Sequence, residues 1–253
     1  MQISTIDWSI LLPACVAGIL VLATHLPLGA QVLRKGIVFI DLAIAQVASV
    51  GVVAAGAMGF EPHGVAVQAS ALLAALAASF ALTLSERFFP EIQEALIGTL
   101  FVVASCIGLI LLASNPQGSE HLKDLLIGQI LWVTWPQIAY MGLVTIVVLT
   151  AWYGIGLARL GRFGFYALFA LAVTASVQLV GVFLVFASLI MPALAVRPWV
   201  QKKQVFASWI VGILGYAVGV VLSAQLDLPT GAVIVLAMAG VAILAAILGK
   251  RLS

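Results

Sequence analysis

Asp41 is the only Asp, Glu, Lys or Arg that falls inside a long apolar stretch of this 253-residue chain. It interrupts the run Arg34–Gly51, which begins with Arg34 and Lys35. Moving a carboxylate into hydrocarbon costs about 2.5–3.5 kcal/mol on insertion scales, so such a group normally faces a bundle interior or a water-filled path. Asp41 is therefore the first candidate for ion or proton chemistry. A structural alternative stays open, because Arg34 and Lys35 are only about two helical turns away and leave Asp41 near enough to the interface to be hydrated or paired.

Glutamines are the other polar side chains of interest in the apolar stretches. Each amide needs partners for its donors and its acceptor, so it is either a member of a structural network or part of a ligand path. Gln46 follows Asp41 by five residues, which is about 140° around an ideal helix, so the two do not share one face. His25 lies near the end of the first apolar stretch, and we expect it to be a local hydrogen-bonding residue.

No sequence pattern of an enzyme is found. The chain has no phosphate-binding lysine loop, no nucleophile elbow, no His-Glu-x-x-His and no Cys-x-x-Cys. Its three histidines are not paired at helical spacing, which argues against a multi-histidine zinc cage. We expect no enzymatic activity and no cofactor in this chain.

The composition is that of an integral membrane protein. The chain is 64% hydrophobic and only 8% charged, whereas a soluble domain is nearer 25% charged. Its long apolar runs favour helices over a barrel, whose strands alternate over about ten residues. The cations are scattered in short loops, so nothing indicates a nucleic-acid partner. We predict an all-α polytopic protein with one transmembrane domain over residues 1–253 in contact with the lipid bilayer, and no cleavable signal peptide, because Asp7 precedes the first apolar run.

The apolar pattern predicts eight to nine transmembrane helices. Two long stretches need a break: Trp132, Trp135 and Pro136 suggest an interfacial piece before the true span in 125–157, and Gly181 suggests two short helices with a tight connection in 165–196. The last helix is expected to end before Lys250. The predicted stretches are 8–28, 37–58, 65–84, 95–113, 125–157, 165–196, 205–224 and a last helix from Pro229.

The distribution of Lys and Arg sets the expected orientation. With nine crossing elements, ten of the eleven cations share one side and only Lys123 is opposite. The positive-inside rule therefore favours nine crossings, with the N-terminus outside and the C-terminus in the cytoplasm. If a break at Pro136 changed the number of crossings, the cations after it would lie on the opposite side of the membrane.

Five segments in order resemble the permease subunits of the metal-ion ABC importers, the zinc and manganese uptake group. Arg34–Gly51 is similar to the second helix of that family, in which an arginine-led stretch leads to an aspartate, a histidine and a glycine. The other segments are Pro13–Gly18 through Gly29, Leu126–Leu131, Val180-Gly181 through Leu189–Ala195, and Asp227–Gly231. Together they extend over most of the chain.

The resemblance carries a set of expectations. The fold would be similar to the permeases of vitamin-B12-importer-like (type II) ABC importers. The chain would be a multi-pass permease in the cell (inner) membrane that imports a divalent metal, with zinc or manganese as the cargo. It would form a homodimer, work with a separate ATP-binding cassette subunit that hydrolyses ATP, and receive the ion from an extracytoplasmic metal-binding protein.

The same resemblance gives candidate sites. Asp41 matches the aspartate of helix two and is the expected metal-transit residue, with Gln46 and Gln129 beside the translocation path. The chain departs from the family here, because Gln46 stands for the histidine with one extra residue of spacing, and Gln129 stands for an aspartate. The cytoplasmic segment 152–165 is about a dozen residues shorter than in the family. We expect Arg159 and Arg162 to dock the ATPase with help from Lys202 and Lys203.

Two other function classes remain open on the residues alone. A secondary ion or small-solute transporter, or a channel, would use Asp41 as its relay. A membrane scaffold without transport activity would need no such residue. An ATP-binding gene and a binding-protein gene next to the gene of this chain would favour the importer.

Overall fold

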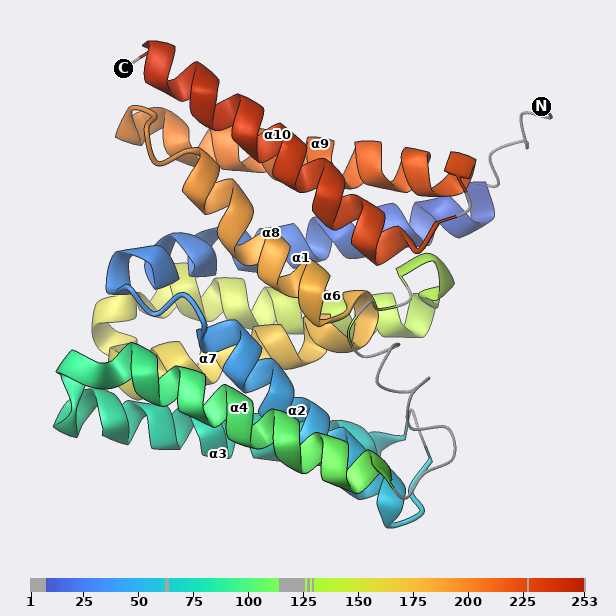
Figure 1. Cartoon of the computed structure of the whole chain (residues 1–253), viewed down its shortest axis with the longest axis vertical. Coiled ribbons are helices and arrows are strands. Elements are labelled where there is room, and N and C mark those ends of the chain that lie inside the picture. The colour runs from blue at the N-terminus through green and yellow to red at the C-terminus, as the bar shows by residue number, and fades with distance from the viewer. Residues whose placement is uncertain are drawn as a thin grey trace. The chain divides into compact units, whose positions relative to one another are not determined.

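The computed structural model describes residues 8–61, 64–113, 126, 128, 130–226 and 228–252, and every regular element within them is helical (Figure 1). Eight of the described helices are long and apolar enough to cross a membrane, and α8 is a shorter apolar helix. This confirms an all-α, polytopic architecture with eight to nine spans. The α-helices are α1 (Trp8–Lys35), α2 (Ile40–Ala57), α3 (Val65–Phe88), α4 (Gln93–Ala113), α6 (Trp135–Thr150), α7 (Leu157–Val180), α8 (Val182–Ala195), α9 (Gln201–Leu226) and α10 (Thr230–Leu252).

Two predicted helix ends were wrong. The first helix does not end near Leu28 but continues to Lys35, and the last helix does not end before Lys250 but runs to Leu252. In α1 the cations Arg34 and Lys35 lie in the last turn, where they are favourable next to the unpaired carbonyl groups of a helix C-terminus. Gly36, with φ of 71°, follows α1, and this left-handed conformation is the usual way for a helix to end.

The two long apolar stretches are broken as expected. A single 3-10 turn, η2 (Ile130–Trp132), precedes α6, and a π-helical turn, η3 (Ala151–Ile155), follows it. Gly181, with φ of 80°, separates α7 from α8. Because a side chain is strained at this φ, glycine is the residue that allows so tight a connection. The prediction of two helices in 165–196 is confirmed.

The chain divides into two compact units, which we describe separately. The first contains Met1–Lys35, Leu126–Thr145 and Ser176–Ser253, and the second contains Gly36–Leu125 and Ile146–Ala175. Helices α6 and α7 each run from one unit into the other. The assignment of one transmembrane domain to residues 1–253 stays a prediction.

The first unit is built on α1, α8, α9 and α10. Helix α8 contacts the other three, and α9 packs along α10. Gly29 of α1 lies directly against the Leu189 carbonyl of α8, so that no side chain fits there. In the same unit Gly128 lies against the backbone at Val180 and Gly181. Gly128 lies in the segment Leu126–Leu131, and Val180-Gly181 begins another of the five segments. Two of the segments that resemble the metal-ion importer permeases therefore pack against each other.

The second unit is organised around α2, which packs against both α3 and α4. Gly51 allows α2 and α3 to approach closely, and the Ser70 hydroxyl donates to the Gly51 carbonyl at 2.8 Å. Close packing through small residues and interhelical hydrogen bonds from hydroxyl groups is typical of membrane helices. This unit holds Asp41 and positions it.

Candidate functional site

Asp41 is the second residue of α2 and is almost completely buried, with 1% of its surface exposed. It lies in the first turn of α2, where the backbone N–H groups have no partner within the helix. Among the residues that the structure describes, Asp41 Oδ1 has no hydrogen-bond partner. A buried carboxylate oxygen without a donor is costly, and such exceptions call for a physical explanation. The arrangement leaves one oxygen available to a cation or to water.

Glu94 lies at the same end of the second unit. Helix α2 has no capping side chain of its own, because Phe39 occupies the N-cap position. Glu94, the second residue of α4, takes this role across the unit, since its Oε1 accepts the Phe39 N–H at 3.2 Å. A carboxylate at a helix N-terminus is stabilised by the exposed N–H groups there. The start of α4 is thus tied to the start of α2, two residues before Asp41.

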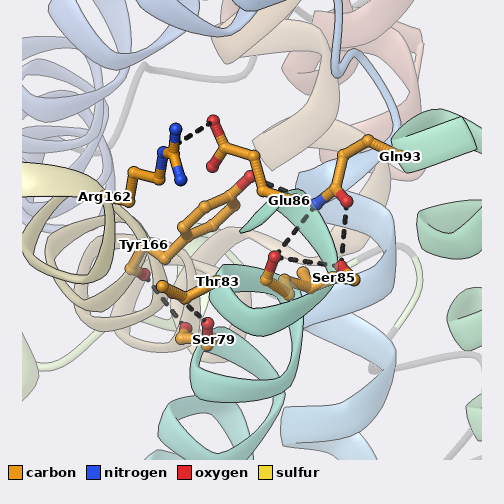
Figure 2. Close-up of polar contacts among 8 residues, drawn as sticks. Ser79, Thr83, Ser85, Glu86, Gln93, Arg162 and Tyr166 are labelled. Atoms are coloured by element: carbon orange, nitrogen blue, oxygen red, sulfur yellow. Dashed lines mark hydrogen bonds and ion pairs between the residues drawn. The ribbon is translucent and has the colours of Figure 1, made fainter. Parts of the chain in front are cut away.

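Next to Glu94, Gln93 is the centre of a buried polar cluster formed by α3, α4 and α7 (Figure 2). Its Nε2 donates to the Leu82 carbonyl at 3.1 Å and to the Tyr166 hydroxyl at 3.3 Å. Its Oε1 accepts from the Ser85 hydroxyl at 2.9 Å. The Ser79 hydroxyl donates to the Tyr166 carbonyl at 3.0 Å. These bonds satisfy a buried amide, as a stable polar cluster requires.

An ion pair extends this cluster toward the basic start of α7. Arg162 Nε is 3.9 Å from Glu86 Oε1, and the Tyr166 side chain lies beside the pair in Figure 2. The Arg162 side chain is 58% exposed, so the pair is largely solvated. Such a pair contributes about 0–1 kcal/mol and orients Arg162 more than it stabilises the fold.

The predicted path residues Asp41, Gln46 and Gln129 are not tested as a group by the described part of the chain. Gln46 is partly exposed on α2, and its spacing of five residues from Asp41 within one helix places it on another face. Gln129 lies outside the described residues. The grouping of Asp41 with Gln46 and Gln129 therefore stays a prediction.

The predicted docking residues are found at two helix starts. Arg159 and Arg162 are exposed in the second unit. Lys203 is exposed at the start of α9 in the first unit, and the side chain of Lys202 is outside the described part. Trp199 anchors the loop before α9, because its Nε1 donates to the Ala245 carbonyl of α10 at 2.9 Å.

His25 is a buried residue of α1 with a local hydrogen bond, as expected. Its Nδ1 is 2.8 Å from the Val21 carbonyl, and since a carbonyl only accepts, Nδ1 carries the proton. Within the described residues its Nε2 has no partner.

Reasoning from the sequence missed Glu94, Gln93 and Tyr166. Glu86 and Glu94 fall between the predicted stretches 65–84 and 95–113. Their positions on either side of Pro90 were the available signal, because the end of one helix and the start of the next lie at the same end of a helical hairpin. Nothing in the sequence indicated Tyr166.

Comparison with known proteins identifies relatives of this chain. A sequence model of the ABC 3 transport family matches residues 7–156 and 154–249. A "Probable metal transport system membrane protein" of Chlamydia muridarum is 25% identical over 183 residues, which cover 64% of this chain and 62% of that protein. The zinc transport system membrane protein TroC of Treponema pallidum is 40% identical over 97 residues, which cover 37% of this chain and 32% of TroC. The matched regions thus span less than two thirds of these relatives.

Two solved structures share the fold. PsaBC from Streptococcus pneumoniae, in complex with Fab, matches with a TM-score of 0.75 and 19% identity over 96% of this chain and 93% of that chain. An inward-facing structure described as a metal-chelate type ABC transporter matches with a TM-score of 0.61 and 18% identity over 100% of this chain and 89% of that chain. Since the family model covers nearly the whole sequence, this chain belongs to the ABC 3 transport family, the permeases of metal-ion ABC importers.

Proposed function

We propose that this chain is the permease subunit of an importer for a divalent metal ion, zinc or manganese, in the cell (inner) membrane. A separate ATP-binding subunit supplies the energy, an extracytoplasmic binding protein delivers the ion, and two copies of the chain form the translocation unit. The match of the family model over residues 7–156 and 154–249 carries this proposal. The zinc transport protein TroC and the metal transport protein of Chlamydia among the relatives support a metal cargo.

The burial of Asp41 is a physical argument for the same function. A membrane chain retains a buried carboxylate mainly where it serves a proton or ion pathway. Carboxylate oxygen suits hard divalent cations such as Mn²⁺ better than soft ones. Asp41 offers one unpartnered oxygen within the described residues, which suits a brief, weak stop. Selectivity would then rest mainly on the binding protein.

The start of α7 supports a compact docking site for the ATPase. Gly156 and Gly161 both have positive φ, 81° and 65°, so residues 157–160 form one short helical turn between two breaks. This turn presents Arg159 at the surface, and Arg162 follows directly. A short turn with exposed cations is suited to contact an acidic groove of a partner. It takes the place of a longer docking segment.

Reconstitution tests the proposal. The chain is purified with its proposed ATP-binding subunit and placed in proteoliposomes with the proposed binding protein. Uptake of radioactive zinc and manganese is then measured with ATP, without ATP and with an imposed proton gradient. We expect uptake that requires ATP and the binding protein. Uptake that follows the proton gradient without ATP would instead support the alternative, a secondary transporter with Asp41 as relay.

A further inference from the structure

The exposed face of α3 is an apolar stripe that ends in a cation. Leu73, Phe80 and Arg87 are seven residues apart, which is about 20° per step around an ideal helix, so they share one face. Leu84 lies near the same face, one turn before Arg87. All four residues are exposed. Helix α3 packs against α2 through its other, buried face, so the stripe is the face that α2 leaves uncovered.

The start of α7 borders this stripe within the second unit. The Phe163 ring packs edge-on against the Phe80 ring, with the ring centroids 6.2 Å apart. Arg162, the neighbour of Phe163, pairs with Glu86 near the end of α3. The start of α7 and the end of α3 therefore lie at the same end of the unit, and Glu86 offsets the charge of Arg162.

Arg87 carries a charge that is not offset in this way. Its guanidinium carbon lies over the exposed Phe88 ring, 5.8 Å from the ring centroid. In the part of the chain that the structure describes, no acid pairs with Arg87. A cation in the last turn of a helix is favourable, which accounts for the position of Arg87. Its exposed guanidinium remains open to an anion.

The dimensions of the stripe fit one leaflet of a bilayer. At 1.5 Å per residue, Phe80 is about 10 Å from Arg87 along the axis of α3. Half of the hydrocarbon core of a bilayer is about 15 Å thick. A lipid whose phosphate lies beside Arg87 would therefore place an acyl chain along Leu84 and Phe80, with Phe163 next to it. The cation and the stripe thus match the two parts of a phospholipid.

The side of the membrane indicates the headgroup. The predicted topology places Arg87 on the cytoplasmic side with most of the other cations. The cytoplasmic leaflet carries anionic lipids, and basic sites beside transmembrane helices on this side bind anionic headgroups. We propose that the end of α3 binds one anionic phospholipid, with its phosphate at Arg87 and an acyl chain on Leu84 and Phe80. This site goes beyond the proposed import of a metal, because it requires only α3, the start of α7 and the orientation of the chain.

Photo-crosslinking identifies what covers the stripe. The photoreactive amino acid p-benzoylphenylalanine replaces Leu84, and the full chain is reconstituted with its proposed ATP-binding subunit in equal amounts of phosphatidylglycerol and phosphatidylcholine. Mass spectrometry measures the ratio of the two lipid adducts, which does not depend on the yield of folded protein. The ratio is compared with that in Arg87→Gln and in Arg87→Lys, which keeps the charge. Arg197→Gln is the matched control, because Arg197 is an exposed arginine of the first unit.

We expect the phosphatidylglycerol adduct to exceed the phosphatidylcholine adduct about fivefold, as one cation near an anionic surface gives. The excess should disappear in Arg87→Gln and persist in Arg87→Lys and Arg197→Gln. Equal amounts of the two adducts with Arg87 present, or an excess that is unchanged in Arg87→Gln, would refute the site. A crosslink to the ATPase or to a second copy of the chain in place of lipid would also refute it, because a protein would then cover the stripe.

Discussion

The Gln93 side-chain amide donates a hydrogen bond to the Tyr166 hydroxyl at 3.3 Å and so joins the first turn of α4 to α7. Gln93 is 5% exposed and Tyr166 is fully buried. The bond thus links Gln93, the neighbour of Glu94, to α7. Helix α7 also carries Arg162, which forms the ion pair with Glu86 of α3. A buried polar contact of this kind holds one geometry, because each broken bond leaves an unsatisfied group.

Gln93→Leu should therefore destabilise the protein. The change removes the amide that donates to the Leu82 carbonyl and the Tyr166 hydroxyl and that accepts from the Ser85 hydroxyl, at a cost of about 1–3 kcal/mol. Thermal unfolding of the detergent-solubilised chain should show a lower Tm. Gln225→Leu is the control, because Gln225 is exposed near the end of α9. Equal Tm values for the two variants would contradict a structural role for Gln93.

Gly29→Ala should separate α1 from α8. A methyl group at Gly29 would collide with the Leu189 carbonyl, and overpacking of this kind costs about 1–3 kcal/mol. Gly98→Ala in α4 is the matched control, since a methyl group there meets nothing within 4 Å and Ala favours the helix. Expression and Tm in detergent should fall for the first variant and stay level or rise for the second. A stable Gly29→Ala protein would mean that the two helices can move apart.

The spans and their breaks were predictable because they depend on local features. Apolar length gives the crossing helices, and Gly181 separates α7 from α8. Helix ends were less predictable, since α1 continues past its predicted end at Leu28 to Lys35 and α10 continues past Lys250, and cations also suit a last helical turn. The bond from Phe39 to Glu94 and the bond from Gln93 to Tyr166 depend on packing between residues 55 and 73 positions apart, which no local pattern contains.

The topology can be tested by cysteine labelling. Single cysteines at Arg34, Arg159, Lys202 and Lys250 should react only with reagents that reach the cytoplasm, because ten of the eleven cations can share one side. Cys15 and Cys106 are exposed and must first be replaced by serine. A cysteine at Lys123 should react from outside. Labelling from outside at any two of the four cytoplasmic positions would refute the arrangement of nine crossing elements.

Charge reversal tests the docking surface. Lys202→Glu together with Lys203→Glu should lower the amount of ATPase that co-purifies with the chain by about tenfold at low salt, if these lysines contact acidic groups of the partner. The effect should shrink as salt screens the charges. Lys123→Glu is the control, since it lies on the opposite side of the predicted topology. Unchanged co-purification in the double reversal would leave docking to Arg159 and Arg162.

Asp41→Asn separates a transport role from a structural role. Asn has the same shape and keeps an acceptor for the first turn of α2, so folding should change little: the lost carboxylate charge at the helix start costs about 0.3–1 kcal/mol, and its lost desolvation penalty offsets this. If Asp41 carries the ion, uptake should fall about tenfold or more, because a neutral amide oxygen attracts a divalent cation weakly. Uptake must be expressed per folded, membrane-inserted chain, and Glu91→Gln serves as the control for a general change in charge. Loss of uptake in proportion to a loss of folded protein would assign Asp41 a structural role. Uptake equal to the wild type at all ion concentrations would remove Asp41 from the path and leave selectivity entirely to the binding protein.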